Sequence, residues 1–85
     1  MSDHVEIQVT CGSVEEADTI ARSLVEDRLV ACAQAMPIRS VYTWRGEVEQ
    51  DDEVLLLLKT RADRVAAVAD WVGRHHSYDL PAVTV

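Results

Sequence analysis

Val54-Leu-Leu-Leu-Leu58 is an unbroken aliphatic run between the acidic segment Glu47–Glu53 and Lys59. Such a run predicts a buried strand, and successive side chains of a strand point to opposite faces of its sheet. Apolar groups must therefore cover both faces of the sheet at this strand. Helices of this chain can cover one face, and the other face needs a different partner.

The residues on the amino-terminal side predict a strand and then a helix. His4–Cys11 alternates between apolar and polar residues, which is the pattern of a strand with one buried face. Ser13 and Glu16 have the spacing of a capping box, in which the serine oxygen accepts from a helix N–H. Apolar residues then recur at helical spacing in Ala17–Leu24, so a helix is expected there.

The remaining segments predict two strands and a second helix. Cys32–Trp44 is rich in small, β-branched and aromatic residues, and Pro37 predicts a bulge or bend within this strand. Arg45-Gly46 marks the turn into the strand that contains the aliphatic run. Helical spacing in Ala62–Val72 predicts a helix that ends at Gly73, and Leu80–Val85 predicts a short edge strand.

The resulting order is β-α-β-β-α-β, within one domain that spans residues 1–85. The expected class is α+β, with a ferredoxin-like sandwich of a four-stranded antiparallel sheet and two helices on one face. A long hairpin joins the second and third strands. No helix is left for the second face, so a second copy of the protein is its expected cover.

Composition excludes several classes of function. Hydrophobic residues make up 48% of the 85 residues and charged residues 27%, as in ordinary globular domains. The net charge of -7 repels phosphate backbones, so nucleic acid is not an expected partner. No apolar run approaches the roughly 20 residues of a membrane span, and the start of the chain lacks the pattern of a signal peptide. No membrane association and a cytoplasmic location are therefore expected.

Cys11, His76 and Cys32 are the candidate metal ligands, with Cys11 and His76 as the expected pair. The topology brings the end of the first strand, the start of the first helix and the loop after the second helix to one end of the sheet. A thiolate and an imidazole there could bind copper or zinc. A competing interpretation is that Cys11 is a small buried hydrophobe and that the adjacent histidines are solvated. Cys32 begins the second strand about 20 Å away, a strand length that prevents the two cysteines of one chain from sharing a metal.

Neither an enzyme nor an organic cofactor is predicted. Cys11 has no basic neighbour in the sequence that would lower its pKa and activate it. The helix start Gly12–Glu16 has carboxylates where an acylphosphatase would need an arginine.

The hairpin carries candidate interface residues. Tyr42 and Trp44 lie two apart and share a face of a hairpin that overhangs the domain, so they are expected to anchor a neighbouring copy. Among the acids of the hairpin, Glu53 is nearest the buried layer. It is expected to pair with an arginine or to bond across a subunit boundary, whereas the acids at the tip are expected to be solvated.

Several ordered segments resemble the CutA divalent-cation tolerance family. They are Ser40-Val-Tyr-x-Trp-x-Gly46, Asp52-Glu-Val-Leu-Leu-Leu-Leu-Lys-Thr60, His76-x-Tyr-Asp-x-Pro81, Val9-Thr-Cys11 and Arg28-Leu-Val-Ala-Cys32. The resemblance implies a compact homotrimer whose long hairpins reach neighbouring subunits. It also implies tolerance of copper and other divalent cations, weak metal binding and no established reaction. The positions that match recurrent site residues of the family are Cys11, Cys32, Tyr42, Trp44, Glu53, Lys59, His76 and Tyr78.

The sequence departs from the family pattern in three places. Ser77 replaces a proline, Glu47 replaces a common lysine, and relatives continue beyond Val85 for another strand or helix. The expected function is therefore a homotrimeric metal-tolerance or metal-response protein. A trimeric small-ligand sensor of the PII type and a purely structural interaction module are the alternatives.

Overall fold

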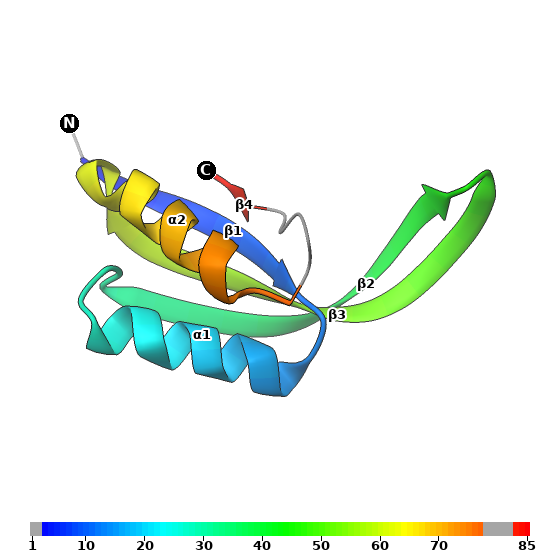
Figure 1. The fold of residues 1–85 in the computed structure, drawn as a ribbon, viewed down its shortest axis with the longest axis horizontal. Helices are drawn as coiled ribbons and strands as arrows, with labels where there is room; N and C mark the ends of the chain where they lie inside the picture. The colour runs from blue at the N-terminus through cyan, green and yellow to red at the C-terminus, as the bar shows by residue number, and fades with distance from the viewer. Residues whose placement is uncertain (1–2, 78–82) are drawn as a thin grey trace.

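The computed structural model describes residues 3–77 and 83–85, with the elements arranged as Figure 1 shows. In chain order they are β1 (His4–Cys11), α1 (Val14–Glu26), β2 (Cys32–Trp44), β3 (Glu47–Arg61), the 3-10 helix η1 (Ala62–Arg64), α2 (Val65–His75) and β4 (Val83–Thr84). The strands pair in the order β2-β3-β1-β4, and every pairing is antiparallel. The predicted α+β class, with two helices and an antiparallel sheet, is confirmed. Three of the strands are long, and β4 has two residues that pair with Gln8 and Val9.

The core fills the space between one face of the sheet and the two helices. Ile7 and Val9 of β1 and Leu56 and Leu58 of β3 are completely buried, and all of them point to the same face by strand alternation. They form one cluster with apolar residues of α1 and α2, namely Ala17, Ile20, Leu24, Val68 and Val72. Both helices therefore cover this face, as predicted.

The other face of the sheet carries the remaining half of the aliphatic run. Leu55 and Leu57 are half-buried there, and Met36, which is the partner of Leu55 on β2, is 40% exposed. Among the described residues no helix covers this face. The alternation expected from the sequence is thus observed, and it leaves apolar side chains in contact with solvent in the single chain.

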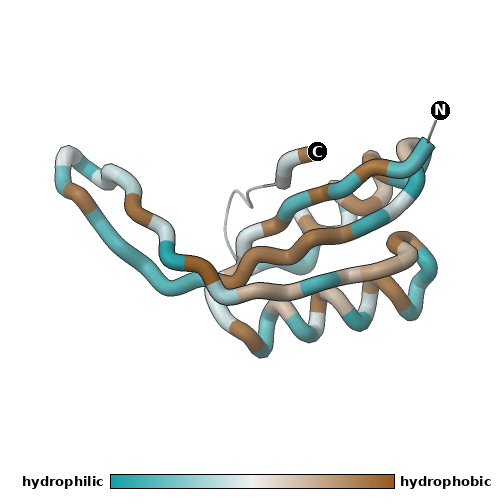
Figure 2. The backbone as a smooth tube through the Cα atoms, turned by 180° about the vertical axis from the view of Figure 1, so that it is seen from behind, coloured by the Kyte–Doolittle hydropathy of each residue, from teal (hydrophilic) through white to brown (hydrophobic). Residues whose placement is uncertain are grey.

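The hairpin of β2 and β3 extends well beyond the helices and bends away from the body (Figures 1 and 2). Arg45 and Gly46 close it with φ values of 53° and 80°, the left-handed geometry that suits a two-residue turn between twisted strands. The radius of gyration is 13.3 Å, whereas a compact domain of this length would have about 12 Å. We call the overhanging part, residues 39–52, the arm.

The sequence predicted a bulge or a bend near Pro37, and the structure has no bulge there. The register between β2 and β3 is continuous from Cys32 opposite Lys59 to Trp44 opposite Glu47. Pro37 lies on β2, an edge strand of the sheet, and edge strands are where proline, which has no N–H to donate, is tolerated.

The second helix differs from its prediction at both ends. Its first turn is the 3-10 helix η1, and α2 continues through Gly73 to His75. An interior glycine costs only about 1 kcal/mol relative to alanine. The stacking of the Trp71 and His75 rings, 4.0 Å apart between centroids, favours the last turn, so His75 belongs to the helix and not to the loop. In the described part of the chain, no helix has both the length and the apolar character needed to cross a membrane.

Candidate metal site

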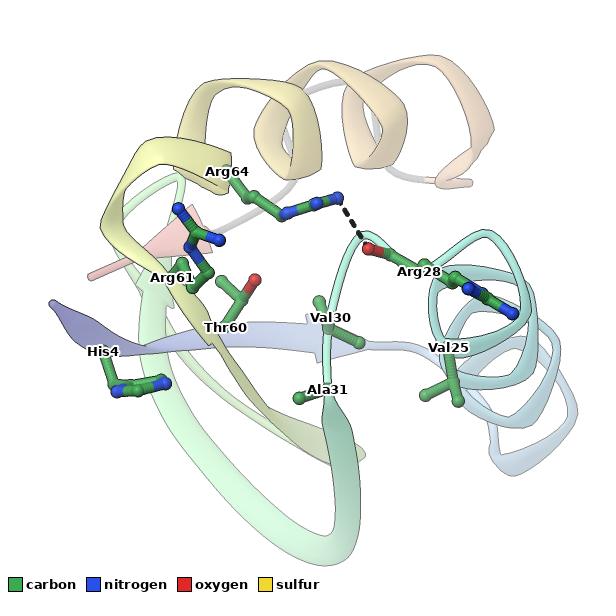
Figure 3. Close-up of a pocket in the computed structure, with 8 residues that line it drawn as sticks. All are labelled: His4, Val25, Arg28, Val30, Ala31, Thr60, Arg61 and Arg64. Atoms are coloured by element: carbon green, nitrogen blue, oxygen red, sulfur yellow. Dashed lines mark hydrogen bonds between the residues drawn. The ribbon is translucent and has the colours of Figure 1, made fainter.

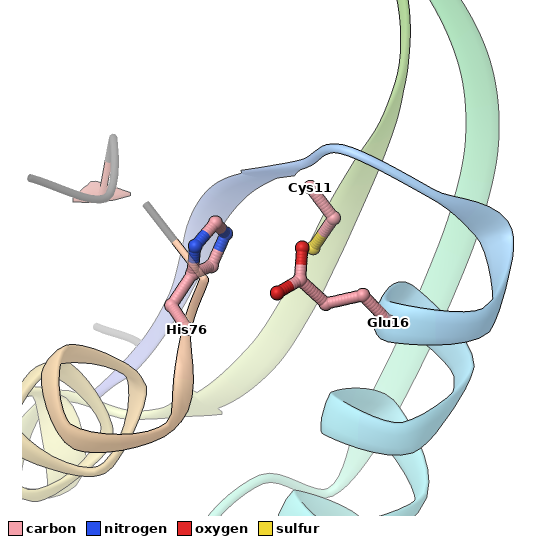
Figure 4. A group of neighbouring side chains, drawn as sticks. All are labelled: Cys11, Glu16 and His76. Carbon is pink, nitrogen blue, oxygen red and sulfur yellow. The ribbon is translucent and has the colours of Figure 1, made fainter. Parts of the chain in front are cut away.

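Three potential metal ligands meet at the end of the sheet from which the arm departs (Figure 4). Cys11 is the last residue of β1, Glu16 lies in the first turn of α1, and His76 directly follows α2. One ligand atom of each, namely a sulfur, a carboxylate oxygen and an imidazole nitrogen, lies within 4.8 Å of the other two. The structure therefore brings together Cys11 and His76, the predicted pair, and adds Glu16.

Glu16 is held by bonds to both ends of the cluster. Its backbone N–H donates to Ser13 Oγ at 3.1 Å, which caps α1 as the sequence predicted. Its carboxylate turns back and accepts from the Gly12 N–H at 3.2 Å through Oε1. The other oxygen, Oε2, accepts from the Ser77 N–H at 2.8 Å. Glu16 thus joins the start of α1 to the segment that follows α2.

His76 is oriented by the backbone of β1. Its Nε2 lies 2.7 Å from the carbonyl oxygen of Thr10. A carbonyl oxygen only accepts, so Nε2 carries the proton, and the lone pair of a neutral imidazole is then on Nδ1. An N–H bond to a backbone carbonyl is the arrangement that fixes the tautomer of metal-binding histidines.

The electrostatics of the cluster keep the thiol protonated and the carboxylate charged. Burial raises the pKa of Cys11 to about 11, and the charges of Glu16 and Glu53 add to this effect. Burial also acts to raise the pKa of Glu16. The hydrogen bonds from Ser77 and Gly12 and the charge of His76 outweigh it, so the pKa of Glu16 is lowered. At neutral pH the cluster is therefore a thiol beside a carboxylate.

This set of donors suits a borderline or soft divalent cation. Sulfur and nitrogen donors favour copper and zinc over calcium or magnesium. Donor atoms around a tetrahedral zinc lie about 3.3 to 3.8 Å apart, given bonds of about 2.0 to 2.3 Å. The donor atoms of the cluster lie within 4.8 Å of one another. Side-chain rotations that move these atoms by about 1 Å would bring them to the spacing found around a bound ion.

Cys32 and Lys59 lie far from this cluster. They are opposite each other where β2 begins, whereas Cys11 is opposite Val54 on β3. Val54 and Lys59 are five positions apart on β3, which corresponds to about 17 Å. The structure therefore places Cys32 and Lys59 at the opposite end of the sheet from Cys11, and both residues are exposed there.

Tyr42 and Trp44 lie on the arm. Trp44 is 59% exposed, and the Arg45 guanidinium lies 5.5 Å from its ring centroid. The Tyr42 hydroxyl donates to Asp51 across the hairpin, and this bond raises the pKa of Tyr42 to about 12. The structure therefore keeps both aromatic rings away from the metal cluster and at the surface of the single chain.

Two further predicted site residues have different outcomes. Glu53 is half-buried opposite Ile38, and its charge contributes to the raised pKa of Cys11. It therefore acts electrostatically on the cluster although it lies on the hairpin. Tyr78 lies outside the described residues.

Glu16 is the residue of the cluster that the sequence interpretation assigned only to capping. The signal that could have identified it was its position in the first turn of a helix that begins just after Cys11.

These observations define an α+β protein with a candidate cation site of sulfur, nitrogen and oxygen donors. The family model described as CutA1 divalent ion tolerance protein matches residues 5–85. The chain therefore belongs to the CutA1 family.

Relatives and solved structures agree with this assignment. The divalent-cation tolerance protein CutA of Archaeoglobus fulgidus is 40% identical over 80 residues, which cover 94% of this chain and 78% of that protein. The Protein CutA homolog of Xenopus laevis is 45% identical over 73 residues, or 85% of this chain. The chain spans only 48% of the Xenopus protein, about half of its length. The crystal structure of CutA1 from Oryza sativa superimposes with a TM-score of 0.94 at 36% identity and covers 98% of this chain and 77% of that one.

Proposed function

We propose that this protein binds a divalent cation, with copper as the first candidate, at Cys11, Glu16 and His76, and that it acts in tolerance of or response to that metal. The convergence of three donor atoms within 4.8 Å is the observation that carries the proposal. The family model is named for divalent ion tolerance and the Archaeoglobus fulgidus relative for divalent-cation tolerance, and neither name describes an enzyme. Binding without catalysis is therefore the function proposed.

The protonated thiol makes this binding weak and dependent on pH. A metal ion must displace the proton of Cys11, whose pKa is about 11. At pH 7 that deprotonation costs roughly 5 kcal/mol, since each pKa unit is worth about 1.4 kcal/mol. His76 must also be neutral to bind, so protons compete with the metal for both ligands and affinity should fall as the pH is lowered.

Calorimetric titrations with Cu(II) and Zn(II) test the proposal. Cys11→Ala, Glu16→Gln and His76→Gln each remove one donor, and each should lower the affinity at least tenfold. Cys32→Ala is the matched control, because it removes a thiol at the far end of the sheet and should leave the affinity unchanged. Co(II) serves as a second probe, because cobalt bound to a thiolate gives a sulfur-to-metal charge-transfer band. This band should disappear in Cys11→Ala and remain in Cys32→Ala.

Equal affinity of the wild type and the three donor variants would contradict the proposed site. Loss of binding only in Cys32→Ala would move the site to the other end of the sheet, where a neighbouring copy would have to supply further ligands.

We also infer that the subunit is a ferredoxin-like sandwich that assembles as a homotrimer. The strand order β2-β3-β1-β4 supports the sandwich. Leu55, Leu57 and Met36 on the face without helices support burial against other copies, because exposed clusters of large apolar side chains mark interaction surfaces. Tyr42 and Trp44 share this face by strand alternation, which makes the arm part of the same surface.

A further inference from the structure

A second hollow lies at the opposite end of the sheet from the metal cluster (Figure 3). Its volume is about 410 Å³. Arg61 and Arg64 border it from the junction of β3 and η1, and Val25 and Arg28 border it from the end of α1 (Figure 3). Thr60 is six residues along β3 from Val54, the partner of Cys11, so the two sites are about 20 Å apart.

Among residues 3–77 and 83–85, those that line this hollow include three arginines and no carboxylate. This composition is unusual for a chain with fifteen acids, eight bases and a net charge of -7. Three other hollows on the surface each include at least one carboxylate: Glu15 and Glu16 in one, Asp52 and Glu53 in another, and Glu26 in the third. The arginine pocket is therefore a local positive site on an acidic molecule, which attracts anions.

Hydrogen bonds hold the Arg64 guanidinium and the loop that carries Arg28 in place. The Arg64 Nη1 donates to the carbonyl oxygen of Arg28 at 2.7 Å, and this bond fixes the Arg64 guanidinium against the loop that follows α1 (Figure 3). The Thr60 hydroxyl donates to the carbonyl of Leu29 at 2.7 Å and pins the same loop from below. Arg28 itself has a φ of 60°, the left-handed conformation that reverses the chain after the helix.

Much of the positive charge of these arginines has no salt-bridge partner among the described residues. Among residues 3–77 and 83–85, Arg28 and Arg64 form no salt bridge, and the carbonyl bonded to Arg64 carries no net charge. Arg61 pairs with Asp63 at 2.8 Å, but both side chains are 61% exposed. An exposed pair of this kind is only weakly stabilising, so an anion can compete for this guanidinium.

The chemistry of the walls selects the kind of anion. Val25, Val30 and Ala31 supply an apolar wall beside the guanidinium groups. Guanidinium groups recognise carboxylate and phosphate oxygens through paired N–H donors. The volume lies near the lower end of the range of about 300 to 1,000 Å³ that is typical of small-molecule sites.

We propose that this pocket binds a small organic anion, with a compact apolar body against Val25, Val30 and Ala31 and one carboxylate or phosphate group on the arginines. The site is independent of the metal cluster and requires no metal. Its occupant would make the protein respond to a small metabolite-sized acid in addition to a cation.

Titrations followed by amide chemical shifts test this inference. Metal is first removed from the protein on a chelating resin, so that failure of the proposed metal site cannot affect the result. The probes are benzoate, phenyl phosphate, inorganic phosphate and the neutral benzyl alcohol. Benzoate or phenyl phosphate should bind saturably in the millimolar range or tighter and shift amides of residues 28–31 and 60–64.

The variants are Arg28→Gln and Arg61→Gln, with Arg74→Gln as the matched control. Each pocket variant should weaken binding of the organic anion at least fivefold. Arg74 lies on α2, pairs with Asp70 at 3.0 Å and does not border the pocket, so its replacement makes the same charge change elsewhere and should have no effect. Amide spectra of the unliganded variants establish that each is folded.

The outcomes separate the two anion classes and expose a failure. Tighter binding of benzoate would assign a carboxylate ligand, and tighter binding of phenyl phosphate a phosphate monoester. Absence of saturable binding by both would overturn the proposal. So would equal weakening in Arg74→Gln, or binding of benzyl alcohol as tight as that of the anions, because the arginines of the pocket would then have no specific role.

Discussion

In the candidate metal site, Glu16 connects the segment before α1 to the segment after α2. Its carboxylate accepts from Gly12 before α1 and from Ser77 after α2, and its charge faces that of His76. Because these interactions lower its pKa, the folded state favours the charged form. The stabilisation is fully present above the unfolded pKa, which is about 4.3, and it is lost as the pH falls through the lower folded value.

We predict that Glu16→Gln lowers the free energy of unfolding at pH 7 by about 1 kcal/mol. The substitution replaces a half-exposed carboxylate, which accepts two charge-assisted hydrogen bonds, with a neutral amide. As the pH falls through the lowered pKa of the folded state, the wild-type carboxylate becomes protonated, so the difference between variant and wild type should shrink. Urea denaturation at pH 7 and pH 3 measures both values.

Glu15→Gln is the control for this prediction, since Glu15 also lies in the first turn of α1 and is exposed. Its effect should be a few tenths of a kcal/mol from the helix dipole. The same loss for Glu16→Gln at both pH values would show that the charge of Glu16 does not stabilise the fold.

The residues of the cluster were only partly predictable from the sequence. Strand alternation and topology placed Cys11 and His76 at one end of the sheet, and the Ser13-x-x-Glu16 spacing predicted the cap. The bond from Ser77 to Glu16 spans 61 positions in the chain and depends on how α2 packs. No local pattern encodes that packing, which is why Glu16 was assigned to capping alone.

At the scale of elements, most of the helices and strands were predicted from the spacing at which apolar side chains recur along the chain. The alternation in His4–Cys11 and the aliphatic run fixed which residues are buried on β1 and β3. The ends of α2 were less predictable, because η1 replaces its first turn and the ring stacking at His75 outweighs the glycine penalty. Terminal turns are decided by side-chain contacts that composition does not reveal.

The acids of the hairpin give a prediction at this scale. Glu47 and Glu49 are exposed on the arm, opposite Trp44 and Tyr42, whereas Glu53 is half-buried beside the core strand. Replacing both Glu47 and Glu49 with glutamine should change the free energy of unfolding by no more than about 0.5 kcal/mol. Glu53→Gln should cost about 1 to 3 kcal/mol, because it removes a charged, partly buried hydrogen-bonding group.

Glu53→Gln should also lower the pKa of Cys11, since the charge of Glu53 is one of the causes that raise it. Chemical denaturation and pH-dependent thiol alkylation measure the two effects. A larger loss of stability in the double variant of the arm, with an unchanged thiol pKa in Glu53→Gln, would mean that the arm and not the layer beneath it carries the stabilising contact.

At the scale of the whole molecule, the exposed apolar residues predict the assembly. The face of Leu55, Leu57 and Met36 continues along β2 to Tyr42 and Trp44, so one surface runs from the body to the arm. A domain of 85 residues buries only about 60 to 65% of its extended-state surface, and the proposed association would add further burial. The sequence predicted this need from the aliphatic run, but it could not show where the arm points.

We predict that light scattering at micromolar concentration gives the mass of three chains. Trp44→Ala should weaken the assembly by about 2 kcal/mol or more, because large aromatic side chains anchor interfaces when they fill a partner's surface. Val14→Ala is the control, since Val14 is an equally exposed apolar residue, at 61%, that lies on α1 and outside the proposed surface. Sedimentation over a range of concentrations should show dissociation in Trp44→Ala and none in Val14→Ala. A folded wild-type monomer would leave the apolar face in water and contradict the assembly, while the metal cluster, which lies within one chain, would still be testable.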